Sequence, residues 1–192
     1  MTAHARGQRE QRAVSVAGDA GASETRDMDS FTTSRLRATR LAADDLDDLV
    51  ALHLDPDVSR YLGGVRTPQA TADYLETNLC HWAEHGVGVW TLRTNDGTYA
   101  GRAGLRYLHV EGVAELEIGY SFAKTLWGRG FATEIAHALV EIWRTRRTDP
   151  SLIGLVMKQN LASERVLQKV GLSYESDTIL HGEKCGVFRL WR

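Results

Sequence analysis

Residues 126–134 read LWGRGFATE and lie between two segments of different period. Before them, residues 114–120 alternate apolar and polar side chains, which is typical of a β-strand. After them, apolar side chains recur at helical spacing from position 132 to position 143. A strand, a glycine-rich turn and a helix in this order predict a helix N-terminus whose backbone N–H groups can bind an anion.

The composition of this turn favours a diphosphate as that anion. Gly128 and Gly130 allow the backbone to approach a ligand closely, and Arg129 adds a positive charge. The turn is not a Walker loop, because no Gly-Lys-Ser or Gly-Lys-Thr follows, and it lacks the third glycine of a dinucleotide fingerprint. Taken alone, Gly-x-Gly before a helix is equally compatible with a turn that binds nothing.

The rest of the chain predicts a mixed α/β domain. We expect helices at 44–54, 67–84, 132–143 and 160–169, and strands at 35–41, 87–93, 99–107, 114–120, 152–157 and 187–190. The long crossover between the strands at 114–120 and 152–157 makes that pair parallel, whereas the short turns before it make antiparallel hairpins. The prediction is therefore a mixed central sheet of about six to seven strands flanked by about four helices.

Composition and charge exclude several classes of protein. The net charge is −2, so we expect no overall field that would attract nucleic acid or an anionic membrane. Cys80 and Cys185 form no CxxC pair, which argues against a zinc site or a disulfide framework and fits a cytoplasmic protein. Residues 1–30 contain no aromatic side chain and no hydrophobic period, so we expect a disordered tail before a single domain at 31–192.

A second polar motif follows the strand expected at 152–157. Asn160 and Ser163 begin the next helix, and Lys-Val-Gly at 169–171 ends it. Together with residues 126–134, this arrangement resembles the GNAT superfamily of N-acetyltransferases, and within it the branch of ribosomal-protein N-terminal acetyltransferases and their relatives. Further marks of that branch are SRLR at 34–37 and DPDV at 55–58.

The resemblance covers residues 33–192 and implies acetyl-CoA as the acetyl donor. The end of the strand would flank the acetyl group and the pantetheine arm, at Ile118, Tyr120 and Phe122. Backbone N–H groups of the turn would cradle the diphosphate, at Gly128, Arg129, Gly130, Phe131 and Ala132, with Thr133 close to it. Asn160 would contact the pantetheine arm, and Ser163 would protonate the departing thiolate.

Three positions depart from the pattern of the superfamily. Trp127 stands where many members have Gln or Arg; it belongs to the predicted cofactor site, and we expect its ring to be an apolar plug under the turn. Leu167 stands where many members have a tyrosine that protonates the thiolate, so Ser163 or water must serve. Lys124 replaces a proline that is common in this branch.

The implied reaction also needs a base, because only the neutral form of an amine attacks a thioester. Glu117, on the polar face of its strand, is the candidate; the alternative is a solvated carboxylate with no catalytic role. Glu115 shares that face and is expected to be exposed to solvent. Ser163 also has an alternative, as a first-turn helix residue with a locally bonded hydroxyl, and Asn160 would in either case cap the helix.

The resulting hypothesis is transfer of an acetyl group from acetyl-CoA to a primary amine by direct attack, without a covalent enzyme intermediate. The acceptor stays open between a protein N-terminus, a polyamine, an aminoglycoside and another small amine. The loops at 61–66 and 181–184 would face it, and they carry no strong charge signature. The family is compatible with a homodimer.

Two alternatives share the same turn: a non-catalytic GNAT-fold protein that binds an acyl-CoA as a sensor or scaffold, and a generic nucleotide-binding protein. No metal is expected, since His81 and His85 lie at helical spacing but no third ligand is near them in the sequence.

Overall fold

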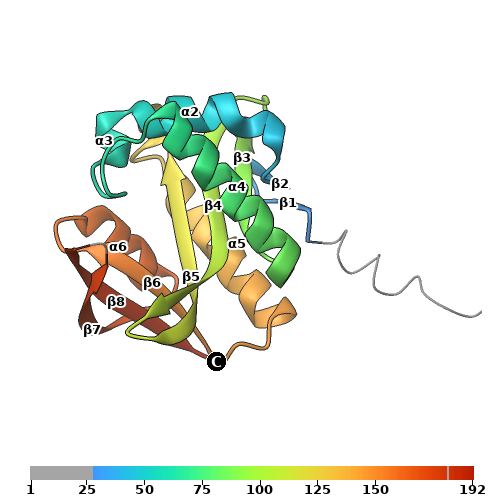
Figure 1. The fold of residues 1–192 in the computed structure, drawn as a ribbon. Helices are drawn as coiled ribbons and strands as arrows, with labels where there is room; N and C mark the ends of the chain where they lie inside the picture. Colours follow the sequence, from blue (N-terminus) through green and yellow to red (C-terminus); the bar gives the residue numbers. More distant parts are fainter. Residues whose placement is uncertain (1–27, 181) are drawn as a thin grey trace, which may run out of the picture.

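The computed structural model describes residues 28–180 and 182–192, so nearly all of the tail predicted at 1–30 lies outside the described residues. The strands of the described residues form one sheet in the order β1-β2-β3-β4-β5-β6-β8-β7 (Figure 1). The strands are β1 (Ser30–Thr32), β2 (Leu36–Arg40), β3 (Val89–Thr94), β4 (Tyr99–Val110), β5 (Val113–Phe122), β6 (Ser151–Met157), β7 (Ser173–Leu180) and β8 (Glu183–Trp191). As the crossover predicted, β5 and β6 are parallel, while the other neighbouring strands described are antiparallel.

Side chains or glycines satisfy the backbone at the ends of some of the helices. They are the 3-10 turns η1 (Ala43–Asp45) and η2 (Lys124–Leu126), and the α-helices α2 (Leu46–Leu54), α3 (Pro56–Ser59), α4 (Pro68–His85), α5 (Phe131–Arg146) and α6 (Leu161–Lys169). The side chain of Thr67 accepts the N–H of Ala70 and starts α4, and Gly86 in the left-handed conformation ends it.

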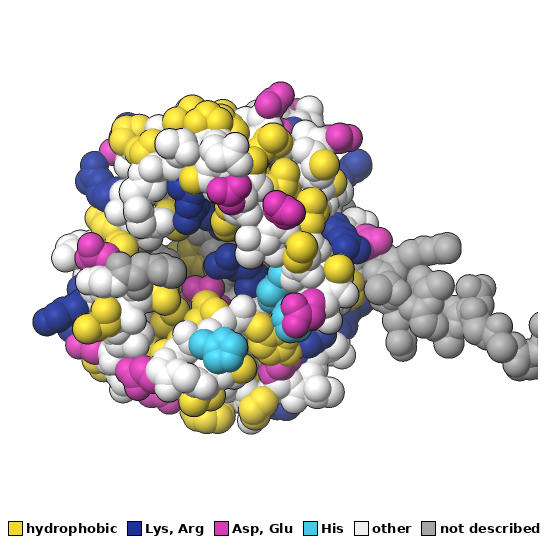
Figure 2. Space-filling model, in the orientation of Figure 1, with side chains coloured by type: hydrophobic (Ala, Val, Ile, Leu, Met, Phe, Trp, Pro, Cys, Tyr) yellow, Lys and Arg dark blue, Asp and Glu magenta, His cyan; other side chains and the backbone are white. Residues whose placement is uncertain are grey.

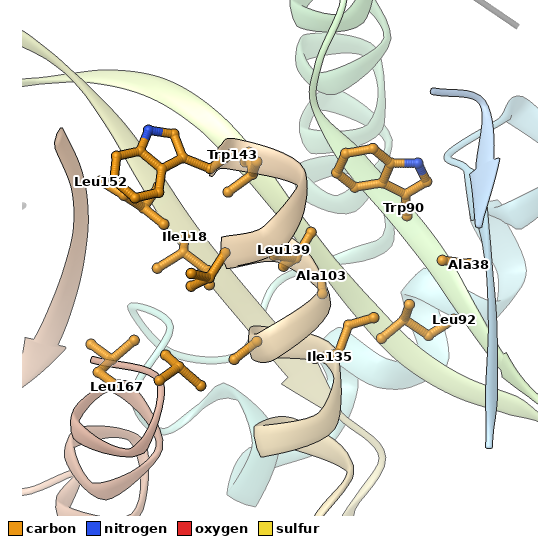
Figure 3. Close-up of a cluster of buried hydrophobic side chains, with 14 of the residues drawn as sticks. Ala38, Trp90, Leu92, Ala103, Ile118, Ile135, Leu139, Trp143, Leu152 and Leu167 are labelled. Carbon is orange, nitrogen blue, oxygen red and sulfur yellow. The ribbon is translucent and has the colours of Figure 1, made fainter. Parts of the chain in front are cut away.

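Two layers of helices cover the sheet, with α2 and α4 on one face and α5 on the other (Figure 1). Ile135, Leu139 and Trp143 of α5 are fully buried in the larger core, which also contains Ile118 and Leu152 (Figure 3). Burial of a side chain of this size stabilises the fold by about 1.5–3 kcal/mol. A smaller core fills the space beneath α2 and α4, formed by Leu41, Leu49, Leu75 and Val89.

The class of fold is as predicted, but the sheet is larger than the pattern indicated. The three-residue strand β1 is too short to show a period, and β7 (SYESDTIL) is an edge strand with mostly exposed side chains. Helix α2 ends at Leu54, where the helix predicted at 44–54 was expected to end. The sequence did not predict the additional turn α3, which starts where the carboxylate of Asp55 accepts the N–H groups of Asp57 and Val58.

The sheet opens between β5 and β6. These strands share a single ladder pair, Glu117–Ile153, whereas β4 and β5 are paired continuously from Gly101–Phe122 to Val110–Val113. Toward the C-terminal end of β5 the two strands diverge (Figure 1), and both α5 and α6 start on this side of the opening. The opening therefore brings two helix N-termini close to the end of β5.

No helix in the described parts of the chain, 28–180 and 182–192, is long and apolar enough to cross a membrane.

Candidate active site

Two left-handed glycines shape the turn before α5. Gly128 has a φ of 72° and Gly130 a φ of 81°, a conformation that residues with side chains disfavour. Gly130 is the N-cap of α5 and offers no side-chain acceptor, so the first-turn N–H groups from Phe131 to Thr133 are open to a ligand. A Cβ atom at Gly128 would meet no atom within 4 Å, so the turn also has free space beside it. This geometry fits a diphosphate.

Arg35 and Glu134 fix this turn to the start of β2. Arg35 donates from Nη1 to the carbonyl of Arg129 at 2.8 Å and from Nε to Glu134 at 2.6 Å. Its guanidinium also lies over the ring of Phe131, 4.3 Å from the centroid. Partial burial alone would raise the pKa of Glu134, but hydrogen bonds from Thr33 and Arg35 lower it below its usual value. Residues 34–37 (SRLR), whose sequence resembles the ribosomal-protein branch, thus hold the turn in place.

Trp127 is not the buried plug that we expected. It is 48% exposed, and its Nε1–H donates to the carbonyl oxygen of Phe122 at 2.9 Å. The reason lies in the local backbone, since η2 ends at Trp127 in an extended conformation. The rings of Phe122 and Phe131 are the buried ones and stack on each other, with centroids 6.2 Å apart. Contact of the exposed indole with a cofactor remains a prediction.

Lys124, which stands where the branch commonly has proline, begins η2 and forms an ion pair with Asp57 of α3 at 2.5 Å. Both side chains are partly exposed, so the pair adds little to stability.

Tyr120 of β5 and Ser163 of α6 meet at the opening between β5 and β6. Their hydroxyl oxygens are 2.9 Å apart, and the Tyr120 hydroxyl also lies 3.1 Å from the carbonyl oxygen of Ser163. Burial raises the pKa of Tyr120 to about 12, so its hydroxyl is a hydrogen-bond donor at neutral pH. Asn160 accepts the N–H of Ser163 at 3.2 Å and thereby positions the serine. Leu167, at the position of the superfamily's tyrosine, is 1% exposed in the core.

Glu117 projects from the face of β5 opposite to Tyr120, because side chains alternate along a strand. Its side chain is 12% exposed and accepts a hydrogen bond from Arg106 at 3.2 Å, so this carboxylate is not solvated, while its catalytic role stays a prediction. Burial raises the pKa of Glu117 and outweighs Arg106, which lowers it. A raised pKa suits a general base, because it approaches the operating pH. Glu115, expected to be exposed, is instead held by Arg189 at 2.8 and 2.9 Å.

His81 has a structural role. Its Nδ1 lies 2.8 Å from the carbonyl oxygen of Val87, and its Nε2 accepts the backbone N–H of Tyr107 at 2.9 Å. Both ring nitrogens are therefore engaged within the fold. Across the residues that the structure describes, no group of three or more His, Cys, Asp or Glu side chains is placed to hold a metal ion.

A group of basic side chains that the sequence did not predict lies on the same face of the sheet as Glu117. Arg102 and Arg106 lie four residues apart on β4 and so share a face. Arg66 reaches them from the loop before α4, which had shown no strong charge signature. Arg102 donates to Nε2 of His53 at 3.3 Å, and Arg66 lies 3.4 Å from the same nitrogen. The available signal was a pair of arginines four residues apart in a largely apolar strand.

A model of the acetyltransferase (GNAT) domain matches residues 35–173. The chain belongs to the GNAT family of acetyltransferases. An uncharacterized Bacillus subtilis protein, YkkB, is 31% identical over 121 residues, which cover 62% of this chain and 70% of that protein.

Solved acetyltransferase structures share most of this architecture. An acetyltransferase from Agrobacterium tumefaciens aligns with a TM-score of 0.76 and 23% identity, covering 96% of this chain and all of the other. A ribosomal L7/L12 alpha-N-protein acetyltransferase in complex with coenzyme A aligns with a TM-score of 0.70 and 15% identity, covering 83% of this chain and 95% of its own. At these identities the likeness shows the GNAT fold that the sequence predicted.

Proposed function

We propose that this protein transfers an acetyl group from acetyl-CoA to a primary amine. The observation that carries the proposal is the arrangement around the opening of the sheet. An anion-binding helix N-terminus and a hydroxyl pair lie on one side of β5, and a buried carboxylate with a raised pKa projects from its other face. The coenzyme A in the ribosomal-protein acetyltransferase of the same fold supports this choice of donor.

The turn before α5 and the edge of β5 would hold acetyl-CoA. N–H groups from Gly128 to Thr133 bind its diphosphate, and Arg129 adds charge. On the edge of β5 that faces β6, the backbone of residues 118–121 lies beyond the ladder pair Glu117–Ile153 and can bond the pantetheine arm. Asn160 can contact that arm while its Oδ1 caps α6. Bound in this way, acetyl-CoA supplies the reactive thioester.

Glu117 accepts the proton that the ammonium form of the acceptor must lose. The amine nitrogen then forms a bond with the acetyl carbon, and the carbon–sulfur bond breaks. As the amide forms, its nitrogen loses a second proton. That proton passes to Ser163, which gives its own hydroxyl proton to the thiolate, and the Tyr120 hydroxyl hydrogen-bonds to the Ser163 oxygen. Glu117 then releases its proton to solvent. Because Glu117 and Tyr120 project from opposite faces of β5, the acceptor and the departing thiol do not compete for the same space.

Thiol release from acetyl-CoA, measured across a panel of amines, tests this function. We expect release that depends on an amine, together with a product heavier by one acetyl group in mass spectrometry. Binding of acetyl-CoA without release with any amine would support the sensor or scaffold instead. Comparable affinities for ATP and CoA would point to a general nucleotide-binding protein.

Ser163→Ala should lower kcat by about 10- to 100-fold, since positioned proton donors contribute on this scale or above it. Tyr120→Phe removes only the partner hydroxyl and should cause a smaller fall in kcat. Ser173→Ala, an exposed position at the start of β7, serves as the control. Unchanged turnover in Ser163→Ala would remove this serine from the mechanism. Steady-state kinetics with saturating acetyl-CoA distinguishes these outcomes.

A further inference from the structure

Three arginines converge on the face of the sheet from which Glu117 projects. Arg102 and Arg66 lie over the ring of Tyr74, 4.7 and 5.2 Å from its centroid. Arg106 contacts Glu117 directly. Figure 2 shows this side of the molecule hollowed in front of β5, with Lys and Arg side chains gathered in the hollow. This arginine cluster (Arg66, Arg102 and Arg106) therefore lies beside the candidate base.

The arginine cluster carries more positive charge than its surroundings neutralise. Glu117 is its one carboxylate partner among the ion pairs of the described residues. His53, which accepts from Arg102 and lies beside Arg66, is uncharged, because burial and these two arginines lower the pKa of His53 to about 3. Three guanidinium groups thus face one carboxylate.

Two acidic side chains at the start of α2, Asp45 and Asp48, already have partners on β3. Asp48 pairs with Arg93 at 2.5 Å, and Asp45 accepts the hydroxyl of Thr91 at 2.7 Å. Neither carboxylate forms an ion pair with the arginine cluster among the described residues.

Among the residues that the structure describes, some hydrogen-bond donors of Arg66, Arg102 and Tyr74 also lack acceptors. Arg66 and Arg102 share the single lone pair of the His53 Nε2, and Arg66 also donates to the carbonyl oxygen of Leu62, so the donors of the two guanidinium groups still outnumber these acceptors. The hydroxyl of Tyr74 is buried and has no hydrogen-bond partner within the described residues. Arg102 is 6% exposed, and a buried guanidinium is normally compensated by an anion. An anionic group between these donors would provide both the charge and the acceptors.

We propose that the acceptor is an amine carrying an anionic group, a carboxylate or a phosphate, which Arg66 and Arg102 bind while its amine faces Glu117. This inference rests on the proposed function, since it names the substrate class of the same site. Planar guanidinium groups recognise both kinds of anion by paired hydrogen bonds. A polyamine carries only positive charge, and the arginine cluster repels it.

Matched pairs of amines test the proposal with the full chain. Amino acids are compared with their carboxamides, phosphoethanolamine with ethanolamine, and spermidine serves as a polycation. We expect kcat/KM for the anionic member of at least one pair to exceed that of its neutral counterpart by about 100-fold, on the scale of a lost charge-assisted hydrogen-bond pair. Comparison of the amino-acid pairs with the phosphoethanolamine pair shows whether the site binds a carboxylate or a phosphate.

Two variants tie this selectivity to the arginine cluster. Arg66→Gln, at a partly exposed position, should raise KM for the anionic amine about 100-fold and leave KM for the neutral amine within a few-fold. Arg102→Lys keeps the buried charge, loses the planar fork, and should reduce the selectivity to a smaller extent. Arg60→Gln is the control, because Arg60 is exposed and pairs with Asp57.

Equal use of neutral and anionic amines, preference for spermidine, or unchanged selectivity in both cluster variants would overturn the assigned acceptor class. Each of those results still includes thiol release and so leaves the proposed function standing. Absence of release with every amine, despite bound acetyl-CoA, would overturn the proposed function and the acceptor class together.

Discussion

Gly130→Glu is expected to bind acetyl-CoA at least about 100-fold more weakly than the wild-type protein. The new carboxylate lies at the N-cap of α5, where it fills the space of the diphosphate and repels its charge. The fold should tolerate the substitution, because the nearest atom to a Cβ at Gly130 is the end of the flexible Arg35 side chain, at 3.5 Å. Calorimetric titration with acetyl-CoA measures the loss.

Gly130→Ala is the matched control for this variant. It shares the strain of a side chain at a φ of 81°, about 1 kcal/mol, but adds no charge and little volume. Both variants should lose similar amounts of thermal stability, while only the glutamate variant should lose most of its affinity. Wild-type affinity in Gly130→Glu would show that the diphosphate does not bind at this turn.

Glu117→Gln is expected to lower kcat by about 100- to 10,000-fold, which is the usual contribution of a positioned base. The amide keeps the shape of the side chain and can still contact Arg106, but it cannot accept the proton of the ammonium. Affinity for acetyl-CoA should not change, because Glu117 faces away from the proposed donor site. Glu115→Gln, on the same strand and face, is the control and should retain turnover.

The pH profile of kcat/KM gives an independent test of Glu117. A base acts only in its deprotonated form, so activity should fall as the pH drops through the pKa of Glu117. Burial raises that pKa, so the fall should begin at a higher pH than for an exposed glutamate. Arg106→Met should move this fall in activity to still higher pH, because Arg106 lowers the pKa of Glu117. A profile unmoved by this substitution would argue that another group is the base.

Local signals in the sequence were sufficient for much of the fold. Thr67 followed by Pro68, and Gly86 after His85, set the ends of α4 through short-range hydrogen bonds that any context would preserve. The glycine turn before α5 was likewise readable, because positive φ values at 128 and 130 depend on the residue type. The strand β7 gave no such signal, since an edge strand with exposed side chains has no apolar period.

The candidate site was readable only in part. Glu117 could be placed on the polar face of its strand, but its burial depends on Arg106 and on the helices above that face. The contact of Tyr120 with Ser163 joins residues far apart in the chain, and it follows from the opening between β5 and β6. Arg66, Arg102 and His53 come from three separate elements, so their convergence required the folded chain. Trp127 was misplaced because its exposure is decided by the extended end of η2.

Calorimetric titration of the full chain with acetyl-CoA, followed by the same titration with ATP, tests the central claim most directly. We predict saturable binding of acetyl-CoA at one site with a Kd on the order of micromolar, and much weaker binding of ATP. Failure to bind acetyl-CoA, or equal affinity for ATP, would contradict the account, because the turn before α5 would then be structural or would serve a different ligand.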